Sequence, residues 1–134
     1  MLRVIVLAAI CAIVVAGCGG GGSPTYTAAA TAPCLQDNGF TSVTTKAAKV
    51  GFIASFATHG GLFANAPGGN GLTIAFAADE TDAASTESAY RKHAPASLRP
   101  HLNDVMESQG NAVLVWTVSP SAHQLSTALG CLRS

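Results

Sequence analysis

Residues 61–78, GLFANAPGGNGLTIAFAA, decide how the fold is interpreted. Two apolar runs flank the segment PGGNG at residues 67–71. Glycine and asparagine readily take the positive φ angles of a tight turn, and the flanking runs are long enough to be strands. The stretch therefore predicts a β-hairpin, around which the neighbouring segments can be placed.

The segments on either side of the hairpin predict two helices and two more strands. Residues 79–93 carry acidic residues in the first turn and basic residues in the last, as the helix macrodipole favours. Residues 40–45, FTSVTT, are rich in β-branched valine and threonine, which favours a strand. Residues 111–118, NAVLVWTV, are typical of a strand buried on both faces. Residues 46–58 alternate like a strand but also fit a helix face, and their KAAK start favours a helix.

The resulting order of elements is β-α-β-β-α-β, with one or two helical turns at 33–39 before it and, after it, a helix that follows Ser119. This is the order of the split βαβ sandwich, also called ferredoxin-like. The sequence therefore predicts a small α+β domain of this type, in which the first strand lies antiparallel beside the last.

The start of the chain has the pattern of an export signal. Arg3 is followed by thirteen apolar residues at 4–16, which would make a helix of roughly 20 Å. Spanning a bilayer takes nearer to about twenty residues, so the run fits the apolar part of a signal peptide better than a membrane span. The end of this run overlaps the tetrapeptide VAGC at 15–18.

Residues 1–18 resemble the signal peptides of bacterial lipoproteins. Val15, Ala16, Gly17 and Cys18 match the lipobox of that family position by position, although Arg3 stands alone where two or three basic residues are usual. The resemblance implies that residues 1–17 are removed and that Cys18 receives lipid. It also implies that this lipid anchors the chain at the extracytoplasmic face of a bacterial cell membrane. An uncleaved anchor helix and an ordinary secreted protein are the alternatives.

The mature chain would then consist of a tether and one domain. Residues 18–33 carry no charge and no hydrophobic period, and we expect them to form a flexible tether. We expect the α+β domain to span residues 34–134.

Two of the four cysteines remain after the leader and the lipidated residue are set aside. Cys11 lies in the leader and Cys18 takes the lipid, which leaves Cys34 and Cys131 at the two ends of the domain. Disulfides persist in extracytoplasmic compartments, so we expect these two cysteines to form a bond that closes the domain. Neither lies in a C-x-x-C motif, the pattern of thiol redox catalysts and many zinc sites.

Composition and motifs narrow the function without naming it. The formal net charge is zero and 10% of the residues are charged, which argues against a nucleic-acid partner. The four histidines lack metal-ligand spacing and no G-x-S-x-G motif occurs, so we expect no metal, cofactor or catalytic residue. Asp79, Glu80 and Asp82 are expected to cap a helix. Trp116 is expected in the core, with a ligand groove formed by Trp116 and Phe76 as the alternative.

We expect a non-catalytic binding or envelope-associated module, held at the membrane by lipid on Cys18, whose partner is an envelope protein or a small molecule. The alternatives are a small extracytoplasmic enzyme such as a hydrolase and a structural subunit of an envelope complex. An exposed apolar patch on the sheet would favour a binding role, whereas a pocket with convergent polar groups and shifted pKa values would favour an enzyme.

Overall fold

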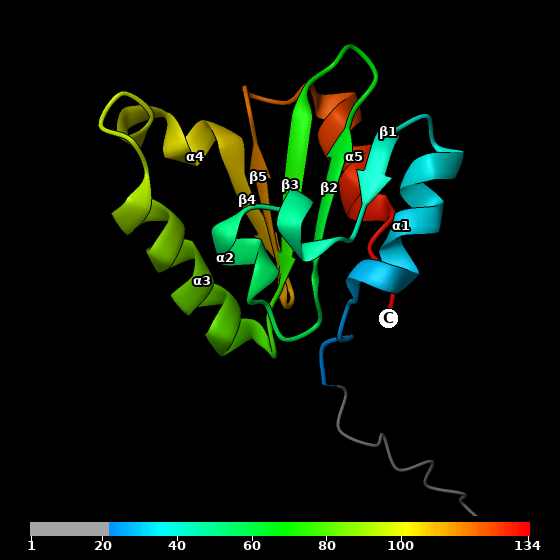
Figure 1. Cartoon of the computed structure of the whole chain (residues 1–134), viewed down its shortest axis with the longest axis horizontal. Helices are drawn as coiled ribbons and strands as arrows, with labels where there is room; N and C mark the ends of the chain where they lie inside the picture. The colour runs from blue at the N-terminus through cyan, green and yellow to red at the C-terminus, as the bar shows by residue number, and fades with distance from the viewer. Residues whose placement is uncertain (1–21) are drawn as a thin grey trace, which may run out of the picture.

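The computed structural model describes residues 22–134, which form a five-stranded antiparallel sheet with helices on both faces (Figure 1). The strands are β1 (Thr41–Thr44), β2 (Gly61–Asn65), β3 (Gly71–Phe76), β4 (Met106–Gln109) and β5 (Ala112–Trp116). They lie across the sheet in the order β1-β2-β3-β5-β4. The helical elements are α1 (Ala28–Asp37), η1 (Ala47–Lys49), α2 (Phe52–Ser55), α3 (Glu80–His93), η2 (Arg99–His101), α4 (Leu102–Val105) and α5 (Ala122–Gly130).

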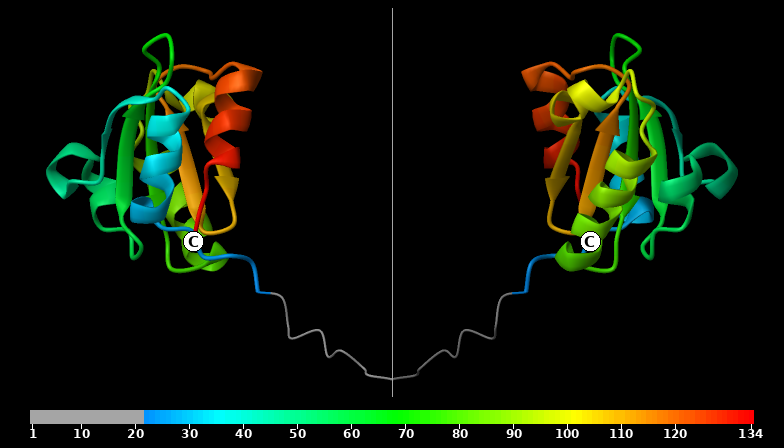
Figure 2. Two further views of the ribbon diagram at one scale, coloured as in Figure 1. Left: turned by 90° about the vertical axis from the view of Figure 1, so that its right-hand side faces the viewer. Right: turned by 90° about the vertical axis from the view of Figure 1, so that its left-hand side faces the viewer.

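The helices form a layer on each side of the sheet (Figure 2). α1 and α5 lie on one side, which we call the closed face, and α2 and α3 lie on the other, which we call the open face. Successive side chains of a strand point to opposite faces. Accordingly, Leu72, Ile74 and Phe76 of β3 belong to the core under α1 and α5, whereas Ala75 packs against Val50 on the open face.

The predicted hairpin is confirmed, with β2 and β3 paired along their length. In its turn Gly68 and Gly69 have φ angles of 93° and 87°, which glycine adopts without steric cost. The other strongly patterned segments are confirmed as β1, α3 and β5. The ambiguous segment at 46–58 forms two short helical pieces, η1 and α2.

The α+β class is confirmed, but the strand order differs from that of a ferredoxin-like sandwich. β1 lies at an edge of the sheet beside β2, and β5 lies between β3 and β4, so the first strand is not beside the last. β3 and β4 are both antiparallel to β5 and hence parallel to each other, with α3 in the connection between them. The fold therefore contains one split βαβ unit.

The difference arises in the segment between β1 and β2. A crossover to a parallel strand usually takes a single helix in a connection of about a dozen residues or more. Here Gly51, at φ 85°, separates η1 from α2, and β2 returns antiparallel to β1. In addition, residues 106–109, which lie between the helix predicted at 79–93 and the strand predicted at 111–118, form the edge strand β4.

The folded part of the chain begins before residue 34, because residues 28–33, expected in the tether, form the first turns of α1. Thr27 caps this helix by accepting a hydrogen bond from the backbone N of Ala30 at 3.2 Å. The buried Asn111 amide accepts from the backbone N of Tyr26 at 2.7 Å and donates to its backbone O at 2.9 Å. No helix among residues 22–134 has the length and apolar character of a membrane span.

The disulfide between Cys34 and Cys131 is confirmed, with the two Cα atoms 5.3 Å apart. It joins α1 to the residue that ends α5, and these two helices lie side by side on the closed face (Figure 2). Neighbouring helices therefore bring the cysteines together, and not the expected contact between the first strand and the last. The backbone O of Arg133 accepts from Thr27 N, and its N donates to Thr31 Oγ1, so both ends of the domain are joined.

Removing the disulfide should destabilise the domain strongly. The bond links residues separated by 97 positions, for which chain entropy gives about 4 to 5 kcal/mol of stabilisation. We expect Cys131→Ser to lower the free energy of unfolding by about 4 kcal/mol, measured by urea unfolding with the fluorescence of Trp116. A reductant should bring the unsubstituted chain to the stability of the variant and leave the variant unchanged. Equal unfolding midpoints for the oxidised chain and the variant would contradict this role.

Candidate functional site

One row of side chains on the open face crosses all five strands. Thr44, Phe63, Thr73, Val115 and Met106 are successive partners in the strand registers. The three central residues are only partly buried, whereas their neighbours along the strands that point to the closed face are almost completely buried. The helices of the open face therefore leave the middle of this row partly uncovered.

One wall beside the row is formed by residues 46–57, which contain η1 and α2 and which we call the flap. Val50 and Ala54 hold the flap on the sheet, and both are buried. This close contact needs a glycine at the first position of β2. A Cβ at Gly61 would lie 2.6 Å from the backbone O of Ala54 and 2.8 Å from Cγ2 of Val50. A larger residue at position 61 would push the flap away from the sheet.

The other wall is the C-terminal half of α3, where Tyr90 and His93 are spaced three residues apart on one side of the helix. Between the walls lies a hollow of about 350 Å³ with Thr73 and Val115 among its lining residues. A second hollow of about 160 Å³ shares Ile53, Tyr90, His93 and Val115 with the first. We call the two hollows together the groove. Its lining residues are Val50, Gly51, Phe52, Ile53, Thr73, Tyr90, His93, Ala94, Pro95, Leu98, Leu102 and Val115.

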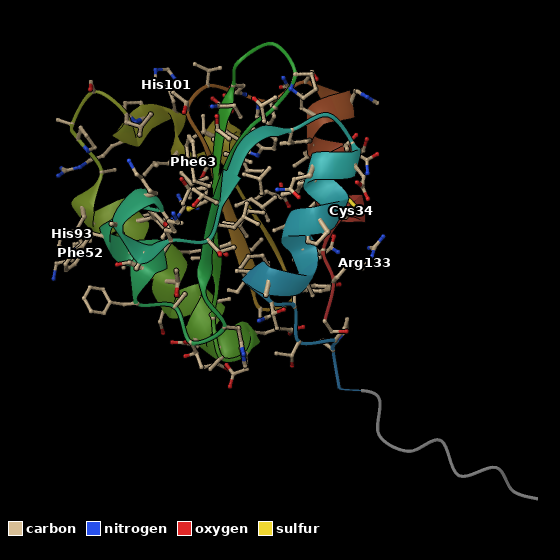
Figure 3. All side chains as sticks on the ribbon, turned by 45° about the vertical axis from the view of Figure 1, so that its right-hand side comes forward. Cys34, Phe52, Phe63, His93, His101 and Arg133 are labelled. Carbon is tan, nitrogen blue, oxygen red and sulfur yellow. A yellow bond between two sulfur atoms is a disulfide. The ribbon has the colours of Figure 1, made fainter. Side chains whose placement is uncertain are left out.

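Two phenylalanines are exposed on the flap beside the groove. Phe52 is 80% exposed and Phe56 is 75% exposed, and their rings pack edge to face with centroids 5.1 Å apart. Figure 3 shows Phe52 and His93 on the same side of the molecule, away from Cys34. Exposed apolar surface that extends into an apolar hollow is typical of a binding site.

The groove has an apolar lining with few polar groups. Thr73 contributes a hydroxyl, Tyr90 a phenol and His93 an imidazole. Burial raises the pKa of Tyr90 to about 12, so its hydroxyl stays protonated at neutral pH and can donate a hydrogen bond. Ligand pockets typically measure about 300–1,000 Å³ and combine apolar walls with a few polar groups, so the larger hollow suits a small ligand.

The residues weighed from the sequence lie outside the groove, except His93. Trp116 and Phe76 are 2% and 0% exposed in the core of the closed face, as expected for Trp116, and they do not form a ligand groove. Asp79 caps α3 as expected, because its carboxylate accepts from Asp82 N at 2.8 Å. Residues 22–134 contain no group of three or more His, Cys, Asp or Glu residues that could hold a metal ion.

The lipidation site predicted at Cys18 lies outside the described residues. Cys34 and Cys131 join helices of the closed face and do not line the groove. The sequence interpretation missed Ile53, Tyr90 and Val115 as site residues. The available signal was the spacing of Tyr90 and His93, which places an aromatic residue and a polar residue on one side of a helix end.

The chain matches no family model, no curated protein and no solved structure. The geometry of the groove is therefore the basis for assigning a function.

Ionisation of the partly buried Tyr90 phenol should weaken the fold at high pH. A free tyrosine has a pKa of about 10, so the raised pKa of Tyr90 contributes stability below pH of about 10 and loses it as the pH rises toward 12. We expect Tyr90→Phe to lessen the fall in stability over this range, measured by urea unfolding at a series of pH values. The difference between the two proteins should be constant below pH of about 9. An identical pH dependence above that value would contradict the burial of the phenol.

Proposed function

We propose that this chain is an exported lipoprotein of a bacterial cell membrane that binds a small, largely apolar molecule in the groove without catalysing a reaction on it. The observation that carries the binding role is the partly uncovered row of the open face. Thr73 and Val115 line an apolar hollow there, and the exposed Phe52 stands on its rim. The closed face, by contrast, is packed by α1 and α5 over almost completely buried side chains.

The exposed aromatic residues favour a binding role for the groove over the alternative that the open face is simply packed incompletely. Burial of a phenylalanine contributes roughly 1.5–3 kcal/mol, but Phe52 and Phe56 remain mostly in water and gain little of this in the isolated domain. Polar residues at these positions would serve the fold equally well. A ligand that covers Phe52 would recover the hydrophobic contribution that the fold leaves unused.

The short segment between Cys18 and Tyr26 supports a position of the domain close to the membrane. Tyr26, whose backbone is bound by Asn111, lies eight positions after Cys18 in the sequence. Even fully extended, eight residues reach at most about 28 Å. Lipid on Cys18 would therefore keep the domain within about one domain diameter of the bilayer.

Lipidation at Cys18 can be tested with Cys11, the cysteine of the predicted leader, as a control. We expect the native chain in the membrane fraction to begin at an acylated Cys18, as measured by mass spectrometry, because only the thiol can accept the diacylglycerol group. Cys18→Ala should leave an unprocessed chain without lipid, whereas Cys11→Ala should be processed normally. An unmodified Cys18 in the native chain would exclude the lipoprotein assignment.

Filling the groove should prevent binding. Val115→Phe places a ring in the hollow, whereas Val118→Phe makes the same change at a position that is 60% exposed and outside the groove. We expect the mature lipidated chain in phosphatidylcholine nanodiscs to bind decan-1-ol, with the Val118→Phe variant binding equally. The Val115→Phe variant should bind about tenfold more weakly, since overpacking costs about 1–3 kcal/mol.

Equilibrium dialysis against nanodiscs without protein corrects for decan-1-ol dissolved in the bilayer. Thermal unfolding of both variants checks that they are folded. Equal binding by all three proteins, or no binding by any, would rule out the groove as an apolar site.

A further inference from the structure

Most basic residues of the described chain lie on or just after the elements that form the two walls of the groove, although Lys46 and Lys49 line a separate hollow beside β1. The chain has seven Lys and Arg residues, of which Arg3 precedes the described part, leaving six. Five of these six lie on the flap or near the C-terminal end of α3: Lys46, Lys49, Arg91, Lys92 and Arg99. The sixth, Arg133, lies at the opposite side, near Cys34 in Figure 3.

Three of the seven acidic residues lie far from the C-terminal end of α3, and Asp37 and Glu107 lie on α1 and β4. Asp79, Glu80 and Asp82 lie at the N-terminal end of α3, the end away from His93. Near the C-terminal end, Asp104 is 3.9 Å from the His101 imidazole, and Glu87 accepts from the Ser108 hydroxyl. The helix dipole places a partial negative charge of about half a unit at the C-terminus of α3, which Arg91 and Lys92 more than offset. The last turn of α3, which borders the groove at His93, is therefore basic.

The shape of the groove complements this charge distribution. The two hollows share four residues, and the smaller one continues the apolar lining past the end of α3 toward Leu98 and Leu102. His93 lines both hollows, whereas Lys92, the neighbouring residue of α3, is exposed and lies outside their lining. An elongated apolar ligand could lie along the lining with its polar end beside these two residues.

We infer that the ligand of the groove is a single-chain anionic amphiphile, such as a fatty acid, with its acyl chain on Val115 and Ile53 and its carboxylate beside Lys92 and His93. This inference rests on the proposed function and adds the charge of the ligand to it. An acyl chain supplies the apolar body that the lining requires, and a carboxylate matches the basic end of the groove.

The test compares decanoate with decan-1-ol, which has the same ten-carbon chain and no charge. Both are added to the mature lipidated chain in phosphatidylcholine nanodiscs at low salt, with free concentrations corrected by dialysis. We expect decanoate to bind at least about threefold more tightly than decan-1-ol, the size of an exposed ion pair. The preference should shrink as salt is raised, because the charges near the groove are exposed.

Two charge variants test where the preference arises. Lys92→Gln should abolish most of the preference for decanoate and leave the affinity for decan-1-ol unchanged. Arg133→Gln removes the same charge on the opposite side and should preserve the preference. Val115→Phe should weaken the binding of both compounds.

Each other outcome overturns a defined part of the account. If decan-1-ol binds and Val115→Phe weakens it, but decanoate binds no more tightly, the groove is an apolar site and the anionic ligand is wrong. If decanoate binds equally well to the Val115→Phe variant, the carboxylate interacts with surface cations outside the groove. If the groove residues respond only to nanodiscs that contain anionic lipid, the face docks on a bilayer and does not hold a single amphiphile. If neither compound binds, both the inference and the proposed function fail.

Discussion

The covalent link between α1 and α5 is the constraint on which the rest of the structure depends. The disulfide between Cys34 and Cys131 holds these helices together over the closed face, where Leu35 and Ala128 are fully buried against the sheet. A domain of this size buries a modest hydrophobic core, so a cross-link that closes 97 positions supplies a large part of its net stability. With this face sealed, the opposite face does not have to be packed completely.

The open face shows the consequence. It is covered by one long helix, the 14-residue α3, and by a flap whose two helical pieces have three and four residues. Gly51 interrupts the flap and Gly61 lets it approach the sheet, so a short segment is held firmly at Val50 and Ala54 while Phe52 projects outward. The sheet and α3 supply a rigid floor and wall for the groove. Stability and the proposed binding would thus be assigned to opposite faces of one sheet, which limits the conflict that often arises between them.

The sequence predicted the elements that carry a local signal. The hairpin, α3, β5 and the disulfide follow from turn residues, charge placement, apolar runs and cysteine positions. β4 was missed because Met106–Gln109 is mostly polar, although Gly110 and Asn111 between β4 and β5 are a two-residue turn signal. The start of α1 was missed because its alanine-rich first turns were assigned to the flexible tether, although Thr27 is a good N-cap residue. The order of strands could not be predicted, since it depends on whether the flap crosses over or returns.

The groove could not be predicted from the sequence either, because it also depends on how the elements are arranged around the sheet. Val115 lies in a run that is apolar on both faces, so its pattern does not reveal that its own face is left partly uncovered. Tyr90 and Ile53 lie on different elements, and only the return of the flap beside α3 brings them to the same hollow. Even the predicted lipobox, the most specific motif in the sequence, would concern anchoring and carries no information about the ligand.

Methyl NMR of isoleucine tests the central claim, that the open face and not the closed face receives a ligand. After residue 18 the chain has two isoleucines, Ile53, which lines both hollows of the groove, and Ile74, which is 0% exposed in the closed-face core. In the mature chain labelled at isoleucine methyl groups and held in phosphatidylcholine nanodiscs, decanoate should shift the Ile53 signal in a saturable manner and leave the Ile74 signal in place. A shift of Ile74 without a shift of Ile53, or no shift of either, would contradict the account.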